Sequence, residues 1–371
     1  MQLLKLVAKQ LTVGEPLPFN VRDELGSLLL ACGQVLRSDA QLEMLLGRGM
    51  YADVEEIKAL AAGRKVAVAT PTVFARWNQL PWALDVLLKN VSVEAGFVAA
   101  CEELAQELIR LVQRDPDVAL FQATRQESHQ LRNYGLTHAM FVATGVLLLA
   151  QRLGWREARQ LTAVQAALTM NLSIVDLQGR FAVHGRMTEE QRAQLRAHPD
   201  TAEAQLRAAG VEDEEWLQAV REHHEHADGQ GYPRGLSQVS ELAELLRLMD
   251  VFMAKISRRE SRPALAVKEA ERQAYALMPG SPFVAALVKE VGIYPPGELV
   301  NLASGERAVV IRRGASMSTP LVAALTDRKG LPITQTPKRD CAQREFSIAA
   351  LESDKTLVSR VPLERLYGLL T

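Results

Sequence analysis

The sequence predicts a mainly α-helical protein, with a small α+β module before the helices and a small β-rich extension after them. Between residues 116 and 290, apolar side chains recur at helical spacing. The flanking stretches instead hold short apolar runs separated by glycine and proline, which is typical of strands and turns. The 371 residues therefore divide into an N-terminal module (1–65), a linker with a connecting helix (66–115), a helical domain (116–290) and a C-terminal extension (291–371).

The N-terminal module combines both kinds of element. Residues 17–36, LPFNVRDELGSLLLACGQVL, indicate a strand, a turn and a second strand, and residues 39–50 indicate a short helix. The linker holds Pro71 and Pro81, and a helical pattern then extends from about residue 90 to 114. This part of the chain predicts no ligand.

The helical domain contains clear helix signals. Thr188 and Gln191 have the spacing of a capping box, in which each side chain bonds to the backbone of the other residue. Residues 139–150, AMFVATGVLLLA, form the longest apolar run. That run is shorter than the ~20 residues of a membrane span, so it predicts a buried helix. Residues 241–256 form another amphipathic helix.

The C-terminal extension shows two hairpin patterns. Residues 297–313 place Ser304 and Gly305 between two β-rich runs, and residues 319–333 place Lys329 and Gly330 in the same way. We expect this extension to pack on the helical domain or to form a dimer face.

Composition narrows the class of protein. The net charge of −1 argues against binding to a nucleic acid polymer, since such proteins usually carry a basic surplus. The three cysteines are far apart and form no metal-binding pair, which favours a reducing compartment. The N-terminus resembles no signal peptide. We therefore expect a cytoplasmic protein without membrane insertion.

Several polar residues fall on faces that should be buried. His138 shares a helical face with Val142 and Val146, and Asp250 shares one with Leu242 and Leu246. His198 precedes Pro199, at what we expect to be the end of the capped helix. His223 and His224 are adjacent, and neighbours on a regular helix diverge by ~100°, so both can reach one ion only at a helix end. Imidazoles with a carboxylate are typical ligands of first-row transition metals.

Each of these residues also has a structural interpretation. A single histidine on an apolar face is more often a hydrogen-bonded core residue, and Asp250 can satisfy a buried arginine. Gly229 and Gly231 can serve as turn residues, and Tyr232-Pro233 as a packed corner. The metal interpretation rests on the whole set, four histidines and one aspartate on inward-facing helical elements.

Residues 223–236, HHEHADGQGYPRGL, match every fixed position of the HD-GYP signature HHExxDGxGYPxGL. The chain resembles that family over roughly residues 120–290. The resemblance implies a helical domain with two or three metals that hydrolyses cyclic di-GMP. It implies these metal ligands: His138, His198, His223, His224 and Asp250. It implies these residues near the bound nucleotide: Gly231, Tyr232, Pro233, Arg259 and Arg262.

The chain departs from the family at the residues that give it its name. The segment AALTMNLSIVDLQ places Met170 and Asn171 at the His-Asp pair and Ile174 at the following lysine. Tyr134 stands where some members carry an extra glutamate, and Met253 replaces an aspartate that often follows Asp250. In the family the missing aspartate bridges two metals. A neutral amide and a soft thioether are poor substitutes for it.

These departures lead us to expect a catalytically impaired protein of cyclic di-GMP signalling. It binds either one Fe, Mn or Zn ion at His198, His223 and His224, or no metal. We expect it to act as a cyclic di-GMP receptor or as a protein-interaction module. In the second role, the GYP face would contact diguanylate cyclase domains. A homodimer is a further expected partner. One alternative is an active phosphodiesterase whose site is completed by Asp176 or His184. The other is a purely structural interaction hub.

Overall fold

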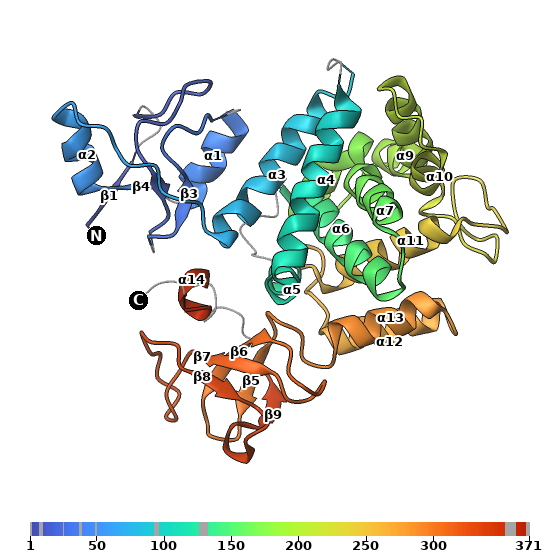
Figure 1. Cartoon of the computed structure of the whole chain (residues 1–371). Coiled ribbons are helices and arrows are strands. Elements are labelled where there is room, and N and C mark those ends of the chain that lie inside the picture. Colours follow the sequence, from blue (N-terminus) through green and yellow to red (C-terminus); the bar gives the residue numbers. More distant parts are fainter. Residues whose placement is uncertain are drawn as a thin grey trace. The chain divides into compact units, whose positions relative to one another are not determined.

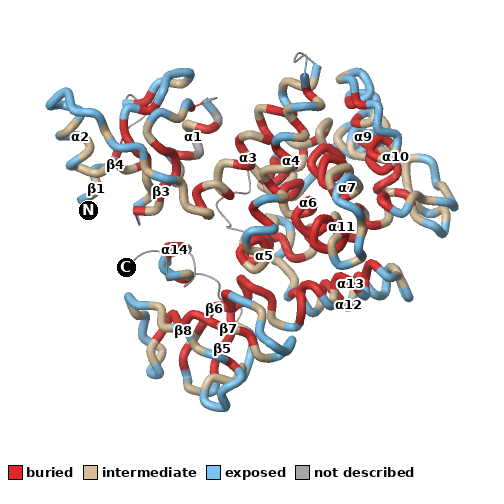
Figure 2. The backbone as a smooth tube through the Cα atoms, viewed as in Figure 1, coloured by how far each residue is buried: buried red, intermediate tan, exposed pale blue. Residues whose placement is uncertain are grey.

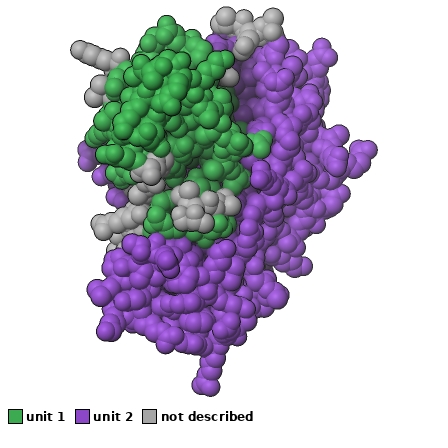
Figure 3. Space-filling view, turned by 60° about the vertical axis from the view of Figure 1, so that its left-hand side comes forward, with its two compact units in different colours: residues 1–86, 356–371 green, residues 87–355 purple. Residues whose placement is uncertain are grey.

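The computed structural model describes residues 2–6, 10–24, 26–36, 39–48, 50–92, 96–125, 133–352 and 361–368. Figure 1 shows the elements in chain order. The chain packs as two compact units, residues 1–86 with 356–371 and residues 87–355 (Figure 3). The four-part division expected from sequence texture stays a prediction.

The first unit holds a four-stranded antiparallel sheet with the strand order β1-β4-β2-β3. Its strands are β1 (Leu3–Lys5), β2 (Val21–Arg22), β3 (Leu28–Leu30) and β4 (Tyr51–Asp53). Its helices are α1 (Asp39–Arg48), α2 (Val54–Ala61), most of α3 (Val73–Lys89) and the short α14 (Leu363–Leu366). The C-terminal segment thus packs with the N-terminal module, where Glu364 accepts hydrogen bonds from Ser27 and Thr72.

The second unit is mainly helical. Its first helices are α4 (Phe97–Arg114), α5 (Pro116–Arg125), α6 (Tyr134–Arg152), α7 (Glu157–Thr169), the 3₁₀ turn η3 (Leu172–Ile174) and α8 (Val175–His184). Then follow α9 (Glu189–Ala208), α10 (Glu214–Glu222), α11 (Glu241–Ile256), α12 (Val267–Leu277) and α13 (Pro282–Val291). In the stretch expected to be a linker, α3 forms a helix of its own, and α4 begins later than the pattern from residue 90 indicated.

Helix α6 lies at the centre of this unit and packs against α5, α7, α8, α11 and α13 (Figure 2). By length and hydropathy it is the one helix among the described residues that could cross a membrane, but 83% of that stretch is buried inside the protein. It is a core helix, as expected for residues 139–150. At Gly135 a Cβ atom would lie 2.5 Å from the carbonyl oxygen of Val175, so only glycine lets α6 approach α8 this closely.

The C-terminal sheet has five antiparallel strands in the order β8-β7-β6-β5-β9. They are β5 (Leu299–Leu302), β6 (Arg307–Arg312), β7 (Leu321–Ala324), β8 (Lys338–Asp340) and β9 (Ile348–Leu351), with the 3₁₀ turn η4 (Arg344–Phe346) before β9. Apolar side chains of β5, β6 and β7 form its core. A mainly helical fold with small sheets in both terminal regions confirms the predicted fold class.

Candidate metal centre

Three histidines converge in the helical unit. His198 lies on α9, His223 is the residue that ends α10, and His224 follows it. One ring nitrogen from each lies within 4.8 Å of the other two. Helix α10 ends at Glu222. The side chains of the adjacent His223 and His224 therefore do not have to point ~100° apart, as neighbours on a regular helix do. The helix end that the sequence required is therefore present.

His198 is oriented by the proline that follows it. Contrary to expectation, Pro199 does not end the helix, and α9 continues to Ala208. In a regular helix the N–H of residue 199 would bond to the carbonyl of Leu195, but proline has no N–H. That carbonyl instead accepts the Nδ1–H of His198 at 2.5 Å. The His-Pro pair therefore fixes the ring and directs Nε2 toward the other histidines.

His223 is oriented in an equivalent way by the end of α10. The last carbonyls of a helix have no partner within the helix. One of them, on Val220, accepts the Nδ1–H of His223 at 2.6 Å. Metal-binding histidines usually donate their second ring N–H to a carbonyl or a carboxylate in this manner.

The two Nε2 atoms then face each other at 3.1 Å. Since both Nδ1 atoms carry the proton, each Nε2 of the neutral rings presents a lone pair. A proton shared between them would make one ring an imidazolium. Burial and the neighbouring His223 oppose this charge and lower the pKa of His198 to about 3. Burial lowers the pKa of His223 as well. Three neutral imidazoles with converging lone pairs fit a transition-metal cation.

The loop after α10 packs against this centre. His224 is half-buried, and the ring of Tyr232 stacks on it with 4.5 Å between the centroids. The buried carboxylate of Glu225 accepts hydrogen bonds from the backbone N–H groups of Arg234 (2.7 Å) and Leu236 (2.9 Å). At Gly231 a Cβ atom would lie 2.4 Å from backbone atoms of Glu225 and His226. The signature residues Glu225 and Gly231 thus fix the conformation of the loop, the first through hydrogen bonds and the second through close backbone packing.

His138 and Asp250 lie beside the three histidines and pair with each other. His138 Nε2 lies 2.7 Å from Asp250 Oδ1. Burial alone would raise the pKa of Asp250, but the hydrogen bond from His138 and the nearby histidines hold it well below its ordinary value. The charge of Asp250 in turn acts on His198, His223 and His224. The cluster that converges on one point contains the three histidines, without His138 or Asp250.

The far side of His138 is closed by Tyr134. The two rings stack with 5.2 Å between the centroids, and the Tyr134 hydroxyl lies 3.4 Å from His138 Nδ1. Arg259 donates to that hydroxyl at 2.5 Å, and its guanidinium lies over the Tyr134 ring. A phenol and an arginine therefore occupy the position that the sequence resemblance matched to a glutamate of some family members.

The degenerate positions are inside the protein. Met170, Asn171, Ile174 and Met253 are all buried. The Nδ2 of Asn171 is buried and has no hydrogen-bond partner. A thioether is a soft ligand and an amide N–H₂ can only donate hydrogen bonds, so the residues at these positions do not fit a second metal. Asp176 and His184 are exposed on α8, and the structure does not bring them into the cluster.

The two arginines expected near a phosphate are engaged inside the protein. Arg259 bonds to Tyr134, and Arg262 donates to the backbone carbonyl of Ala254. Sequence reasoning singled out both residues but did not foresee these internal partners. It also missed Leu195 and Val220, whose carbonyls orient the histidines. The His198-Pro199 pair was the available signal for the first of these.

Comparisons with known proteins agree with this geometry. Residues 106–275 match the model of the HD domain family. A cyclic di-GMP phosphodiesterase of Pseudomonas aeruginosa is 31% identical over 251 residues, which cover 64% of this chain and 58% of that protein. An HDG"Y"P protein of Bdellovibrio bacteriovorus has a similar fold, with a TM-score of 0.50 and 15% identity over 78% of this chain and 99% of its own.

Residues 106–275 are thus similar to HD domains in sequence, and the chain is similar to an HDG"Y"P protein in fold. The matched stretch contains all five expected metal ligands, the loop from His223 to Leu236, and the segment with Met170 and Asn171. It ends within α12, before the C-terminal sheet. The chain spans 58% of the length of the Pseudomonas protein. The activity of that whole protein is therefore not assigned to this chain by the similarity.

Proposed function

We propose that this chain is a phosphodiesterase-like protein that binds cyclic di-GMP but turns it over weakly or not at all. It serves either as a receptor for the nucleotide or as an interaction module that responds to it. The observation that carries this proposal is the contrast between two neighbouring positions. The three-histidine cluster has the donor set of a metal site, whereas the positions that match the His-Asp pair carry a buried thioether and an amide whose N–H₂ has no partner.

His198, His223 and His224 would hold one Fe, Mn or Zn ion. Such an ion supplies a positive charge that attracts and orients a phosphate oxygen. Asp250 lies close enough to offset part of this charge, and its pairing with His138 keeps the carboxylate ionised. The chain's own residues therefore bind and orient an anion.

Weak turnover follows from the second position. Phosphodiester hydrolysis in the family uses adjacent metals, which together activate the nucleophile and stabilise the developing charge. Met170 and Asn171 replace both ligands that the His-Asp pair would provide, and Ile174 stands in place of a cationic partner for phosphate. Tyr134 and Arg259 further close the side of His138 where some members bind an additional metal.

The nucleotide assignment rests on the intact GYP loop and on the Pseudomonas relative, which is described as a cyclic di-GMP phosphodiesterase. Gly231, Tyr232 and Pro233 keep the signature beside the metal site. The same face is our proposed contact for diguanylate cyclase domains, and the C-terminal sheet our proposed dimer face. We place the protein in the cytoplasm, consistent with its separated cysteines.

The test combines metal analysis, calorimetry and an activity assay on protein purified without chelators. We expect about one metal ion per chain, heat on titration with cyclic di-GMP, and no linear pGpG or GMP with added manganese or iron. Rapid turnover that disappears in His223→Ala would establish the active phosphodiesterase instead. If the folded protein binds neither metal nor nucleotide, the purely structural interaction hub is the hypothesis that remains.

A further inference from the structure

We propose that Arg196 is the cation that binds a phosphate group beside the three-histidine centre. The inference deepens the proposed function, on which its choice of ligand rests, by naming a residue that supplies the positive charge for phosphate that Ile174 cannot provide. Neither the signature nor any expected ligand includes Arg196.

The position of Arg196 places it beside the centre and in solvent. It is an exposed residue of α9, the helix that also carries His198. Its guanidinium carbon lies 5.4 Å from the centroid of the Tyr232 ring, and Tyr232 stacks on His224. The series Arg196, Tyr232, His224 thus leads from the surface to the half-buried member of the histidine cluster.

Arg196 is free to take an anionic partner. On a helix its natural partner would be Asp200, four residues later. In the structure Asp200 is bound instead by Arg234 of the GYP loop at 2.7 Å. Within the described residues Arg196 forms no ion pair with any carboxylate. Arg259 and Arg262, the arginines expected from the family pattern, are both engaged by internal acceptors.

The chemistry favours a phosphate oxygen as the ligand. A guanidinium presents paired N–H donors that match phosphate geometry. The cation–π contact with Tyr232 holds the side chain near the site without neutralising its charge. A phosphate drawn to the three-histidine centre would therefore find a second, preoriented cation beside Tyr232, in a protein where Ile174 stands at the position of the family lysine.

The experiment compares wild-type protein with Arg196→Ala, Arg196→Lys and Arg192→Ala by calorimetry with cyclic di-GMP and, separately, with inorganic phosphate. Arg192 is the matched control, because it is an exposed arginine one turn earlier on α9 that pairs with Glu189. Metal content is measured in every sample. We expect Arg196→Ala to weaken binding ~10-fold, Arg196→Lys to weaken it less, and Arg192→Ala to leave it unchanged, all with equal metal content.

The outcomes separate this inference from the proposed function. If cyclic di-GMP binds equally to wild type and Arg196→Ala, the inference is wrong and the receptor function stands. If only inorganic phosphate binds, and Arg196→Ala weakens it, the inference stands and the nucleotide assignment fails. If wild type binds neither ligand, both fail. A loss of metal in Arg196→Ala alone would show a structural role and overturn the inference.

Discussion

At the scale of single residues, the centre depends on two backbone carbonyls that have no N–H partner within their helix. Pro199 frees the carbonyl of Leu195, and the end of α10 frees that of Val220. Each freed carbonyl takes up a histidine Nδ1–H, which fixes the tautomer and leaves Nε2 for a cation. Pro199 is not itself a metal ligand, but it thus sets the orientation of the ligand His198.

The variant Pro199→Ala tests this arrangement. The new backbone N–H would compete with His198 for the Leu195 carbonyl, so the ring loses its fixed orientation. We expect metal affinity to fall ~10-fold, as for other partners that orient a ligand. Stability should not fall, because replacing an interior helix proline gains up to ~3 kcal/mol. Competition titration with a metal chelator and thermal unfolding measure the two effects, and unchanged affinity would contradict the assignment.

The degenerate pair makes a second prediction at this scale. Asn171 keeps a buried amide nitrogen without a partner, at a cost of ~1–3 kcal/mol. The double variant Met170→His, Asn171→Asp restores the ligand types of the family. We expect metal content to rise from about one to about two ions per chain, and cyclic di-GMP hydrolysis to appear. Asn171→Asp alone serves as control and should gain neither; a double variant that still binds one ion would refute this explanation of the impairment.

Glu271 on α12 sets a pH dependence of stability. It is nearly buried, one carboxylate oxygen has no partner, and burial raises its pKa to about 7. The folded protein therefore binds a proton that the unfolded chain releases near pH 4.5, so this residue costs stability increasingly as pH rises from about 4.5 to 7. We expect Glu271→Gln to stabilise the protein by roughly 2–3 kcal/mol at pH 8 and hardly at pH 4. Denaturant unfolding at both pH values decides; an equal gain at both would exclude the burial argument.

At the scale of elements, sequence patterns predicted the parts whose cause is local. The capping box of Thr188 and Gln191 forms as expected, because both partners lie within one turn. The helix end that brings His223 and His224 together was predicted from their adjacency. By contrast, Pro199 suggested a helix end where α9 continues, and Arg259 bonds to Tyr134 on α6, which is distant in the sequence. Contacts between distant segments depend on packing, which spacing along the chain does not encode.

The loop from His224 to Leu236 allows an element-scale prediction. In Gly231→Ala the new Cβ would meet backbone atoms of Glu225 and His226, which cannot move aside as a side-chain end would. The loop must shift, and the stacking of Tyr232 on His224 is disrupted with it. We expect cyclic di-GMP binding to weaken at least ~10-fold while the helical fold persists. Calorimetry with circular dichroism measures both, with the exposed neighbour Gln230→Ala as control; wild-type affinity in Gly231→Ala would be the contrary result.

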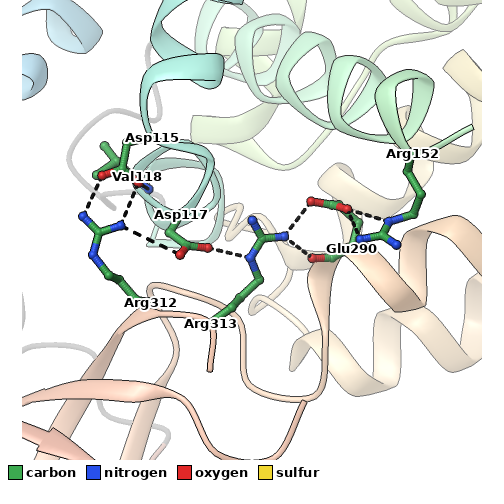
Figure 4. A network of polar contacts seen from close by, with 7 residues as sticks. All are labelled: Asp115, Asp117, Val118, Arg152, Glu290, Arg312 and Arg313. Atoms are coloured by element: carbon green, nitrogen blue, oxygen red, sulfur yellow. Dashed lines mark hydrogen bonds and ion pairs between the residues drawn. The ribbon is translucent and has the colours of Figure 1, made fainter. Parts of the chain in front are cut away.

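At the scale of the second unit, a series of ion pairs connects the C-terminal sheet to helices α5, α13 and α6 (Figure 4). Arg313, at the end of β6, donates to Asp117 on α5 and to Glu290 on α13. Glu290 also accepts from Arg152, at the last turn of α6. The helix that carries His138 is therefore joined through Glu290 to the sheet. The sequence predicted that the extension packs on the helices or forms a dimer face, but did not indicate the residues involved.

Two adjacent arginines allow this connection to be tested. The side chain of Arg313 is 29% exposed and pairs with two largely buried carboxylates. Arg312 is 44% exposed and pairs closely with Asp115, and only at 3.9 Å with Asp117. Arg313→Met leaves Asp117 without this partner and Glu290 with Arg152 alone. We expect it to cost ~2 kcal/mol of unfolding free energy, because a poorly hydrated carboxylate loses its counterion.

The matched change Arg312→Met should cost less than ~1 kcal/mol, as is usual for exposed ion pairs. Hydrogen exchange adds the spatial test. If the network couples the sheet to α6, Arg313→Met will speed exchange in β6 and near the C-terminal end of α6, whereas Arg312→Met will not. Equal costs for the two variants, with exchange changed only at β6, would show that the charges hold the sheet locally and do not reach the helix of His138.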